Sequence, residues 1–254
     1  TLEGSLADRS TLHGRWTLDA EDLAGWPWLA AQLQPGTTLA LDDTQLDASG
    51  AIDAGQLGAS TLRLRAGRVF ARIGEAATQA ISAVDITAWL EALDGGWRLQ
   101  LPKAALSGAR GPWQLDGLTV TQTADGAQTL IAPRLRLDDL APWLGYLRAL
   151  PPKLARLADA RGDLEALRLT RGAGPAAGAP RALDVHARLV GLGLASRDDQ
   201  PGFANLNGEL QASADSGLIT LAGTPLQLHL PKAFSEPLPI DARSEEHTSE
   251  LQSL

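Results

Sequence analysis

Apolar and polar residues alternate with a period of two along most of the chain. In the segment STLHGRWTLD, residues 10–19, Leu12, Trp16 and Leu18 fall on one side and polar residues occupy the other. Successive side chains of a β-strand point to opposite faces of a sheet. This spacing therefore predicts a strand with one buried and one wet face.

The same alternation recurs in five later segments. Their apolar positions are Leu62 and Leu64, Leu99 and Leu101, Leu135 and Leu137, Leu183, Val185 and Leu189, and Leu226 and Leu228. Residues 41–50, 123–128 and 213–217 are rich in Asp, Asn, Gly or Ser and separate the runs, as hairpin turns do. We predict a mainly β protein, an antiparallel sheet with one apolar and one polar face.

Three short segments interrupt this alternation and resemble one another. Each begins with Asp, continues with Leu or Ile, and carries Trp four residues after the Asp; they start at Asp22, Asp85 and Asp139. An Asp at a helix start accepts hydrogen bonds from free backbone N–H groups, so each segment is predicted to be a short capped helix that buries its Trp. Each could be an independent helix, but we favour an internal repeat of sheet followed by helix. A further short helix is predicted over residues 152–160.

Composition narrows the class of protein. The chain is 44% hydrophobic and 20% charged, which is typical of a globular domain, and its formal net charge is −8. Nucleic-acid binding needs clustered Lys and Arg, so no nucleic-acid partner is expected. The absence of Cys excludes disulfides and thiolate metal sites. Residue 1 is Thr and the chain has no Met, so we expect a fragment of a longer protein, without any membrane anchor that the whole protein carries.

No catalytic motif emerges from the sequence. His13, His186 and His229 fall on the polar sides of predicted strands, and no spacing typical of metal-ligating His occurs. Adjacent acidic pairs lie at strand ends or turns, where turn formation explains them. We therefore expect no enzyme, no cofactor and no metal. A β-sandwich sugar hydrolase stays open as an alternative and would need two carboxylates facing each other across a cleft.

Two arrangements of the strands fit the alternation. A closed sandwich would seal the apolar faces between two sheets. A long curled sheet would instead leave an open hydrophobic groove, with a few short α-helices at its rim. A large uncovered apolar surface generally marks a ligand or membrane partner, and a groove of this kind suits acyl chains.

Residues 132–169 and 184–241 carry a resemblance to a known family. A strand leads into the D-L-x-x-W segment, then into a Pro-flanked helix and an R-G-x-L strand; PGFANLNGEL, residues 201–210, and an L-x-L-P-x-x-F segment ending at Phe234 follow. In this order the segments resemble the YhdP-like branch of the AsmA-like proteins, relatives of TamB in Gram-negative envelopes. The resemblance extends over most of residues 1–242.

The resemblance implies a segment of a long periplasmic protein, anchored in the inner membrane, that carries phospholipids between the inner and outer membranes in a hydrophobic β-groove. Phospholipid is then the expected partner. The expected groove-lining residues are Leu12, Trp16, Leu18, Leu62, Leu64, Leu99, Leu101, Leu135, Leu137, Leu183, Val185, Leu189, Leu226 and Leu228. The alternative is a scaffold that assists outer-membrane assembly through protein contacts at its sheet edges and transports nothing.

The last twelve residues, 243–254, differ in composition from the rest of the chain. RSEEHTSELQSL is rich in Ser and Glu and has no alternation. It resembles the in-frame translation of a common sequencing-library adapter, and the competing reading is a solvated acidic tail. We expect this segment to be non-native and disordered, so that the β-groove domain comprises residues 1–242.

Overall fold

The computed structural model describes residues 2–3, 13–21, 31, 33–53, 56–75, 78–148, 152–173, 182–197, 200–222 and 225–240. The strands are β1 (Leu2–Glu3), β2 (His13–Glu21), β3 (Thr37–Asp42), β4 (Gln45–Asp53), β5 (Gln56–Ile73), β6 (Gln79–Leu93), β7 (Gly96–Gly108), β8 (Gly111–Gln114), β9 (Leu118–Gln122), β10 (Gln128–Arg136), β11 (Ala160–Arg171), β12 (Leu183–Leu194), β13 (Gly202–Ala212), β14 (Gly217–Leu221), β15 (Leu226–His229) and β16 (Leu238–Ile240). The helices are α2 (Leu137–Leu144) and η3 (Pro152–Asp159), which is a 3₁₀ helix.

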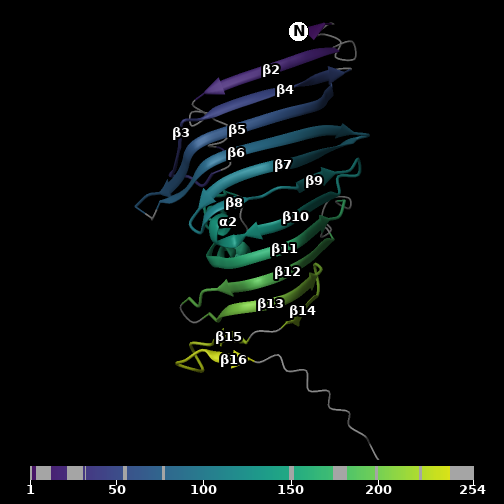
Figure 1. The fold of residues 1–254 in the computed structure, drawn as a ribbon. Coiled ribbons are helices and arrows are strands. Elements are labelled where there is room, and N and C mark those ends of the chain that lie inside the picture. The colour runs from purple at the N-terminus through teal and green to yellow at the C-terminus, as the bar shows by residue number, and fades with distance from the viewer. Residues whose placement is uncertain are drawn as a thin grey trace, which may run out of the picture.

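All sixteen strands belong to one antiparallel sheet, stacked nearly in chain order from β1 to β16 (Figure 1). Three long strands each pair, on one side, with two shorter strands that lie end to end. Strand β5 pairs with β4 and β3, β7 pairs with β9 and β8, and β13 pairs with β15 and β14. The predicted curled, open sheet with few helices is confirmed. Within the described residues no second sheet covers the first, so the sandwich alternative is not supported.

The third D-L-x-x-W segment forms a helix as predicted, but its Asp has another role. The cap position of α2 is Arg136, and Asp139 lies inside the first turn, where it forms a buried ion pair with Arg136 at 3.0 Å. The strand before it ends at Arg136, so Leu137 begins the helix and does not continue the strand as predicted. The helix predicted over residues 152–160 is present as η3.

The helix predicted at Asp85 is wrong. This segment lies in the middle of β6, between β5 and β7, and Asp85 pairs in register with Arg65 and Ala105. Val84, Ile86 and Thr87 are β-branched, and strands are available on both sides, so sheet pairing overrides the local capping signal. The segment starting at Asp22 lies outside the described residues. In the described chain, the repeat hypothesis therefore has one helical copy, the segment at Asp139.

The apolar core lies on one face of the sheet in two contiguous clusters. One is centred on Val84, Ala104 and Trp113, with Leu140 of α2 packed against it. The second is centred on Leu167 and Leu189. Partly buried Leu118 and Leu135 pack against both clusters, so the core is continuous from β5 to β13.

The helices position one end of this apolar face. Helix α2 contacts β11, β6 and η3, and thus lies across the apolar side of the sheet at one end of the strands (Figure 1). The chain before β3 is joined to the end of α2 by a bridge between Leu33 and Leu147 and by a hydrogen bond from Gln34 N to Tyr146 O at 2.8 Å. The rest of the apolar face extends away from these elements.

Candidate functional site

An uninterrupted row of small and apolar residues crosses the sheet at right angles to the strands. Directly opposed residues on neighbouring strands lie on the same face. The register pairs the members of this row one after another across ten strands: Trp16, Gly50, Ser60, Leu90, Leu99, Val120, Leu130, Leu169, Val185 and Ala212. Every member is half-buried, so the row is neither sealed in a core nor fully exposed. We call it the apolar row.

Burial increases from the apolar row towards α2. On the same face, Leu46, Leu64, Ile86 and Ala104 pair in a row nearer the helix, and Leu46 and Ala104 are buried. In the second core cluster, Leu189 of β12 is 2% exposed. The apolar face is therefore packed in the two core clusters, one of them against α2, and half-open along the apolar row.

The apolar row begins with an unusual contact between β2 and β4. A Cβ on Gly50 would lie 2.8 Å from Nε1 of Trp16, so the indole lies over the bare backbone of this glycine. Ser60, the one hydroxyl residue of the row, donates its proton to Gly58 O at 3.1 Å. The glycine thus lets an aromatic side chain extend the apolar row across β4.

The expected groove-lining residues fall mostly on this face. Trp16, Leu99 and Val185 belong to the apolar row. Leu18, Leu62, Leu64, Leu101, Leu135, Leu189, Leu226 and Leu228 pair with or pack against residues of the same face. Leu183 is exposed at the start of β12, Leu137 lies in α2, and Leu12 is outside the described residues.

Sequence reasoning missed the small members of the apolar row, Gly50, Ser60 and Ala212, and four large ones: Leu90, Val120, Leu130 and Leu169. Val120 and Leu169 lie in short alternating stretches, LTVTQ and LRLTR, whereas Leu130 lies in QTLIA, where three apolar residues follow one another. Leu90 was missed because the segment that starts at Asp85 was predicted to be a helix. Extending the alternation to every run of four residues would have identified Val120 and Leu169.

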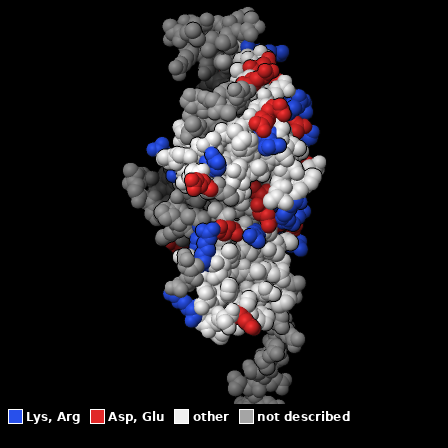
Figure 2. Space-filling view, turned by 90° about the vertical axis from the view of Figure 1, so that its left-hand side faces the viewer, with Lys and Arg blue, Asp and Glu red and all other residues white. Residues whose placement is uncertain are grey.

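The opposite face of the sheet is polar and carries several ion pairs. Arg63 holds Asp85 with Nε and Nη2, each 3.3 Å from a carboxylate oxygen, and Lys103 Nζ lies 3.0 Å from the same carboxylate. Hydrogen bonds from Arg63, and then from Lys103, lower the pKa of Asp85. Figure 2 shows charged side chains of both signs along one margin and across the middle of the view, above a broader uncharged surface towards the C-terminal strands.

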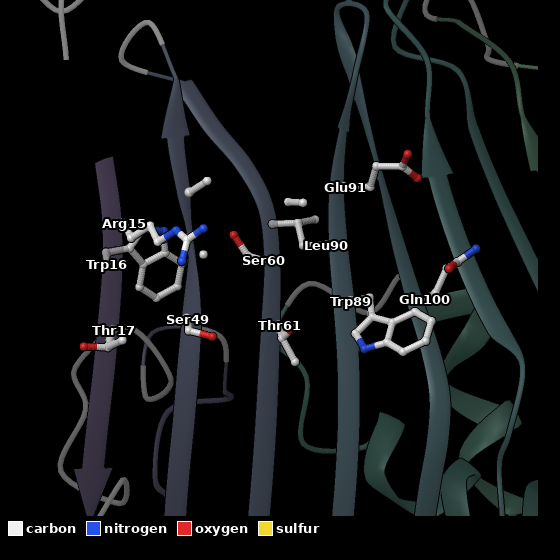
Figure 3. A pocket seen from close by; sticks show the side chains of 13 residues that line it. Arg15, Trp16, Thr17, Ser49, Ser60, Thr61, Trp89, Leu90, Glu91 and Gln100 are labelled. Atoms are coloured by element: carbon white, nitrogen blue, oxygen red, sulfur yellow. The ribbon is translucent and has the colours of Figure 1, made fainter. Parts of the chain in front are cut away.

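An open hollow of about 690 Å³ lies over β2, β4, β5, β6 and β7; most of its lining residues belong to the polar face, but Trp16, Gly50, Ser60 and Leu90 of the apolar row also line it (Figure 3). Thr61, Trp89 and Gln100 succeed one another in register across it. Trp89 is 50% exposed, so the tryptophan that the sequence predicted to turn inward lies on the outer, polar side. The reason is that Trp89 follows a strand period and not a helical one.

The described residues show no arrangement typical of an active site. No group of three His, Asp or Glu side chains that could hold a metal ion occurs among them. Among the helices of the described chain, none is long and apolar enough to cross a membrane.

An open antiparallel sheet with one polar face and one continuous, half-exposed apolar face places the chain among all-β proteins that present apolar surface to a partner or ligand. The chain belongs to the YhdP family: the family described as "YhdP protein" matches residues 1–249. It is 25% identical over 240 residues to the intermembrane phospholipid transporter YhdP of Escherichia coli strain K12. This match covers 90% of the chain but 19% of the relative, so the chain spans about a fifth of that protein. No solved structure matches it significantly.

Proposed function

We propose that this chain is a segment of a periplasmic conduit that carries phospholipids between the inner and outer membranes. Acyl chains would lie on the apolar face, and head groups would stay at its wet margin. The observation that carries the proposal is the apolar row, which crosses ten strands without a charged residue. The name of the Escherichia coli relative, an intermembrane phospholipid transporter, supports the same function.

The dimensions of the apolar row suit a passage better than a single binding site. With neighbouring strands about 4.8 Å apart, ten strands give a row roughly 43 Å long. Contact with apolar surface contributes about 25 cal/mol per Å². Because every member of the row is half-buried, no strand offers a deep pocket, and a lipid can move from one strand to the next.

The lining residues of this conduit are the fourteen expected from the sequence, together with Leu90, Val120, Leu130 and Leu169. The full-length protein would be anchored in the inner membrane, with this chain as an intermediate part of the conduit. The anchor and the contact with the outer membrane would lie in other parts of that protein. No nucleic acid, metal or cofactor takes part in this mechanism.

The proposal is tested by photo-crosslinking in the full-length protein in cells. A benzophenone amino acid at Leu99, a member of the apolar row, should capture phospholipid. The same group at the adjacent Arg98, which points to the polar face and pairs with Glu91 at 3.3 Å, is the matched control and should capture none. Capture of proteins but no lipid at Leu99 would favour the scaffold alternative and overturn the proposal.

A further inference from the structure

The sheet opens between β8 and β10, where the pairing partner of β7 changes from β9 to β8. The first half of β7 pairs with β9 and its second half with β8, whereas β10 pairs with β9 and, in the described chain, not with β8. Arg136, at the end of β10, bridges this opening: its Nη1 donates to Gly111 O at 3.3 Å and to Pro112 O at 3.1 Å. Its guanidinium carbon lies 5.7 Å from the centroid of the Trp113 ring. Figure 1 shows β8 and α2 at this place.

A hollow of about 890 Å³ lies beside the opening, on the polar face. Its charged lining residues are Arg110, Arg134 and Arg136, and no carboxylate is among the described residues that line it. Ser82, Ser107 and Gln114 also line it. Leu106 and Trp113, which alternate with these polar residues and belong to the first apolar cluster, line it as well.

Three carboxylates outside the hollow hold the arginines in place, and the first of them is Asp139, which pairs with Arg136 at 3.0 Å. Asp163, whose side chain is 5% exposed, accepts from Nη1 of Arg110 at 3.0 Å and from Nη2 of Arg134. Asp138 lies 3.1 Å from Nη1 of Arg110 and accepts from the backbone N–H of Gly162. The arrangement fixes cationic groups at the hollow before any ligand arrives, which lowers the entropic cost of binding.

The two more exposed arginines keep hydrogen-bonding capacity on the side of the hollow. A guanidinium has five N–H donors. The side-chain bonds of Arg110 to described residues use its Nη1, and those of Arg134 use its Nη2. Their side chains are 43% and 50% exposed, so the other nitrogens are accessible to a ligand.

We propose that this hollow binds a phosphate-bearing polar group. The planar fork of Arg matches two phosphate oxygens at once, and the hydroxyls of Ser82 and Ser107 and the amide of Gln114 add uncharged donors. Its volume lies within the range of ordinary ligand pockets, and it fits a group larger than inorganic phosphate, such as a glycerol phosphate. The site stands independently of the conduit, except that a phospholipid head group as its source rests on the proposed function.

The strength of binding follows from the local charge. Three arginines lie near three carboxylates, so the attraction for an anion comes from the direction of the N–H groups and not from a large net charge. Binding should therefore be weak and decrease with salt, as expected for partly exposed charges. A weak site permits release of its ligand.

The test is a titration of this 254-residue chain with sn-glycerol 3-phosphate at low salt, in which calorimetry measures the binding. Saturable binding is expected, and Arg134→Gln should weaken it at least tenfold. Arg134→Lys, which keeps the charge and loses the fork, should fall between the two. Arg98→Gln, which removes an exposed arginine of the same face outside the hollow, is the control and should leave binding unchanged.

Thermal unfolding of each variant checks that it is folded, and Gln114→Ala replaces Arg134→Gln if that variant does not fold. Absence of saturable binding by the original chain, or equal losses in Arg98→Gln and the hollow variants, would overturn the proposal. Vesicles of phosphatidylglycerol and of uncharged diacylglycerol then distinguish a lipid head group from a soluble phosphate ester as the source. Phosphate binding without lipid capture at Leu99 would keep this site and refute the conduit.

Discussion

The two parts of the apolar face have the same sequence pattern and different surroundings. Ala104, in the cluster that Leu140 of α2 packs against, and Leu189, in the neighbouring cluster, are almost completely buried. Along the apolar row, residues of the same type are half-buried on every strand. The difference comes from what lies over the sheet and not from the strands themselves. An apolar strand face thus supplies stability at one end and, by our proposal, a lipid-contacting surface at the other.

The largest effect is expected from the ion pair at the start of α2. In Asp139→Ala, Arg136 loses its partner at 3.0 Å and stays buried, so the free energy of unfolding should fall by about 3–5 kcal/mol. Asp138→Ala, which removes a more exposed carboxylate of the same turn, should cost about 1 kcal/mol. Urea unfolding measures both. Equal losses would mean that the buried pair does not secure the covered end of the sheet.

Leucine truncation separates the two parts of the apolar face directly. Leu189→Ala leaves a cavity in a packed cluster and should lower the free energy of unfolding by about 3 kcal/mol. Leu99→Ala, in the half-buried apolar row, should lower it by about 1 kcal/mol because less buried surface is lost. Chemical denaturation of the two variants, side by side, is the measurement. A larger loss at Leu99 would show that the row is a sealed core.

Gly50 tests whether the apolar row is built for its tryptophan. Gly50→Val places its side chain against both Ser60 and the indole of Trp16, and overpacking of this kind should cost about 2 kcal/mol. Gly58→Val, at an ordinary contact distance from Ala51 on the neighbouring strand, is the matched control and should cost less. Thermal unfolding compares the two. A tolerated valine at residue 50 would mean that the indole is not fixed over β4.

The smallest effect is expected on the polar face, and it depends on pH. The pKa of Asp85 is lowered in the folded chain, so its stabilisation is present above the unfolded pKa of about 3.9 and disappears as pH falls through the folded pKa. Asp85→Asn should reduce stability by less than about 1 kcal/mol at pH 7, since Arg63 and Lys103 are solvent-exposed. The stability curves of the two proteins should converge towards pH 2. A constant difference over this range would exclude the ion pair as its cause.

The sheet and its two faces could be predicted from the sequence because alternation is a local property. Leu62 and Leu64 oppose Arg63 and Arg65 as expected, and the same holds for Val185 against His186. The helix at Asp139 was also readable from its Trp and Pro.

Other features could not be predicted because they depend on contacts between distant segments. The segment at Asp85 has the same local signals as the one at Asp139, but strands on both sides hold it in β6. The arginine hollow brings Arg110 to Asp163, 53 residues away.

The proposed function requires the apolar row to contact lipid on all ten of its strands. The most direct measurement places a photo-crosslinker at three members of the apolar row far apart in the stack, Trp16, Leu99 and Val185, and at their polar-face neighbours Thr17, Arg98 and His186, in the full-length protein in cells. The account predicts phospholipid adducts at all three row positions and at none of the neighbours. Adducts on both faces alike, or at one row position alone, would contradict it.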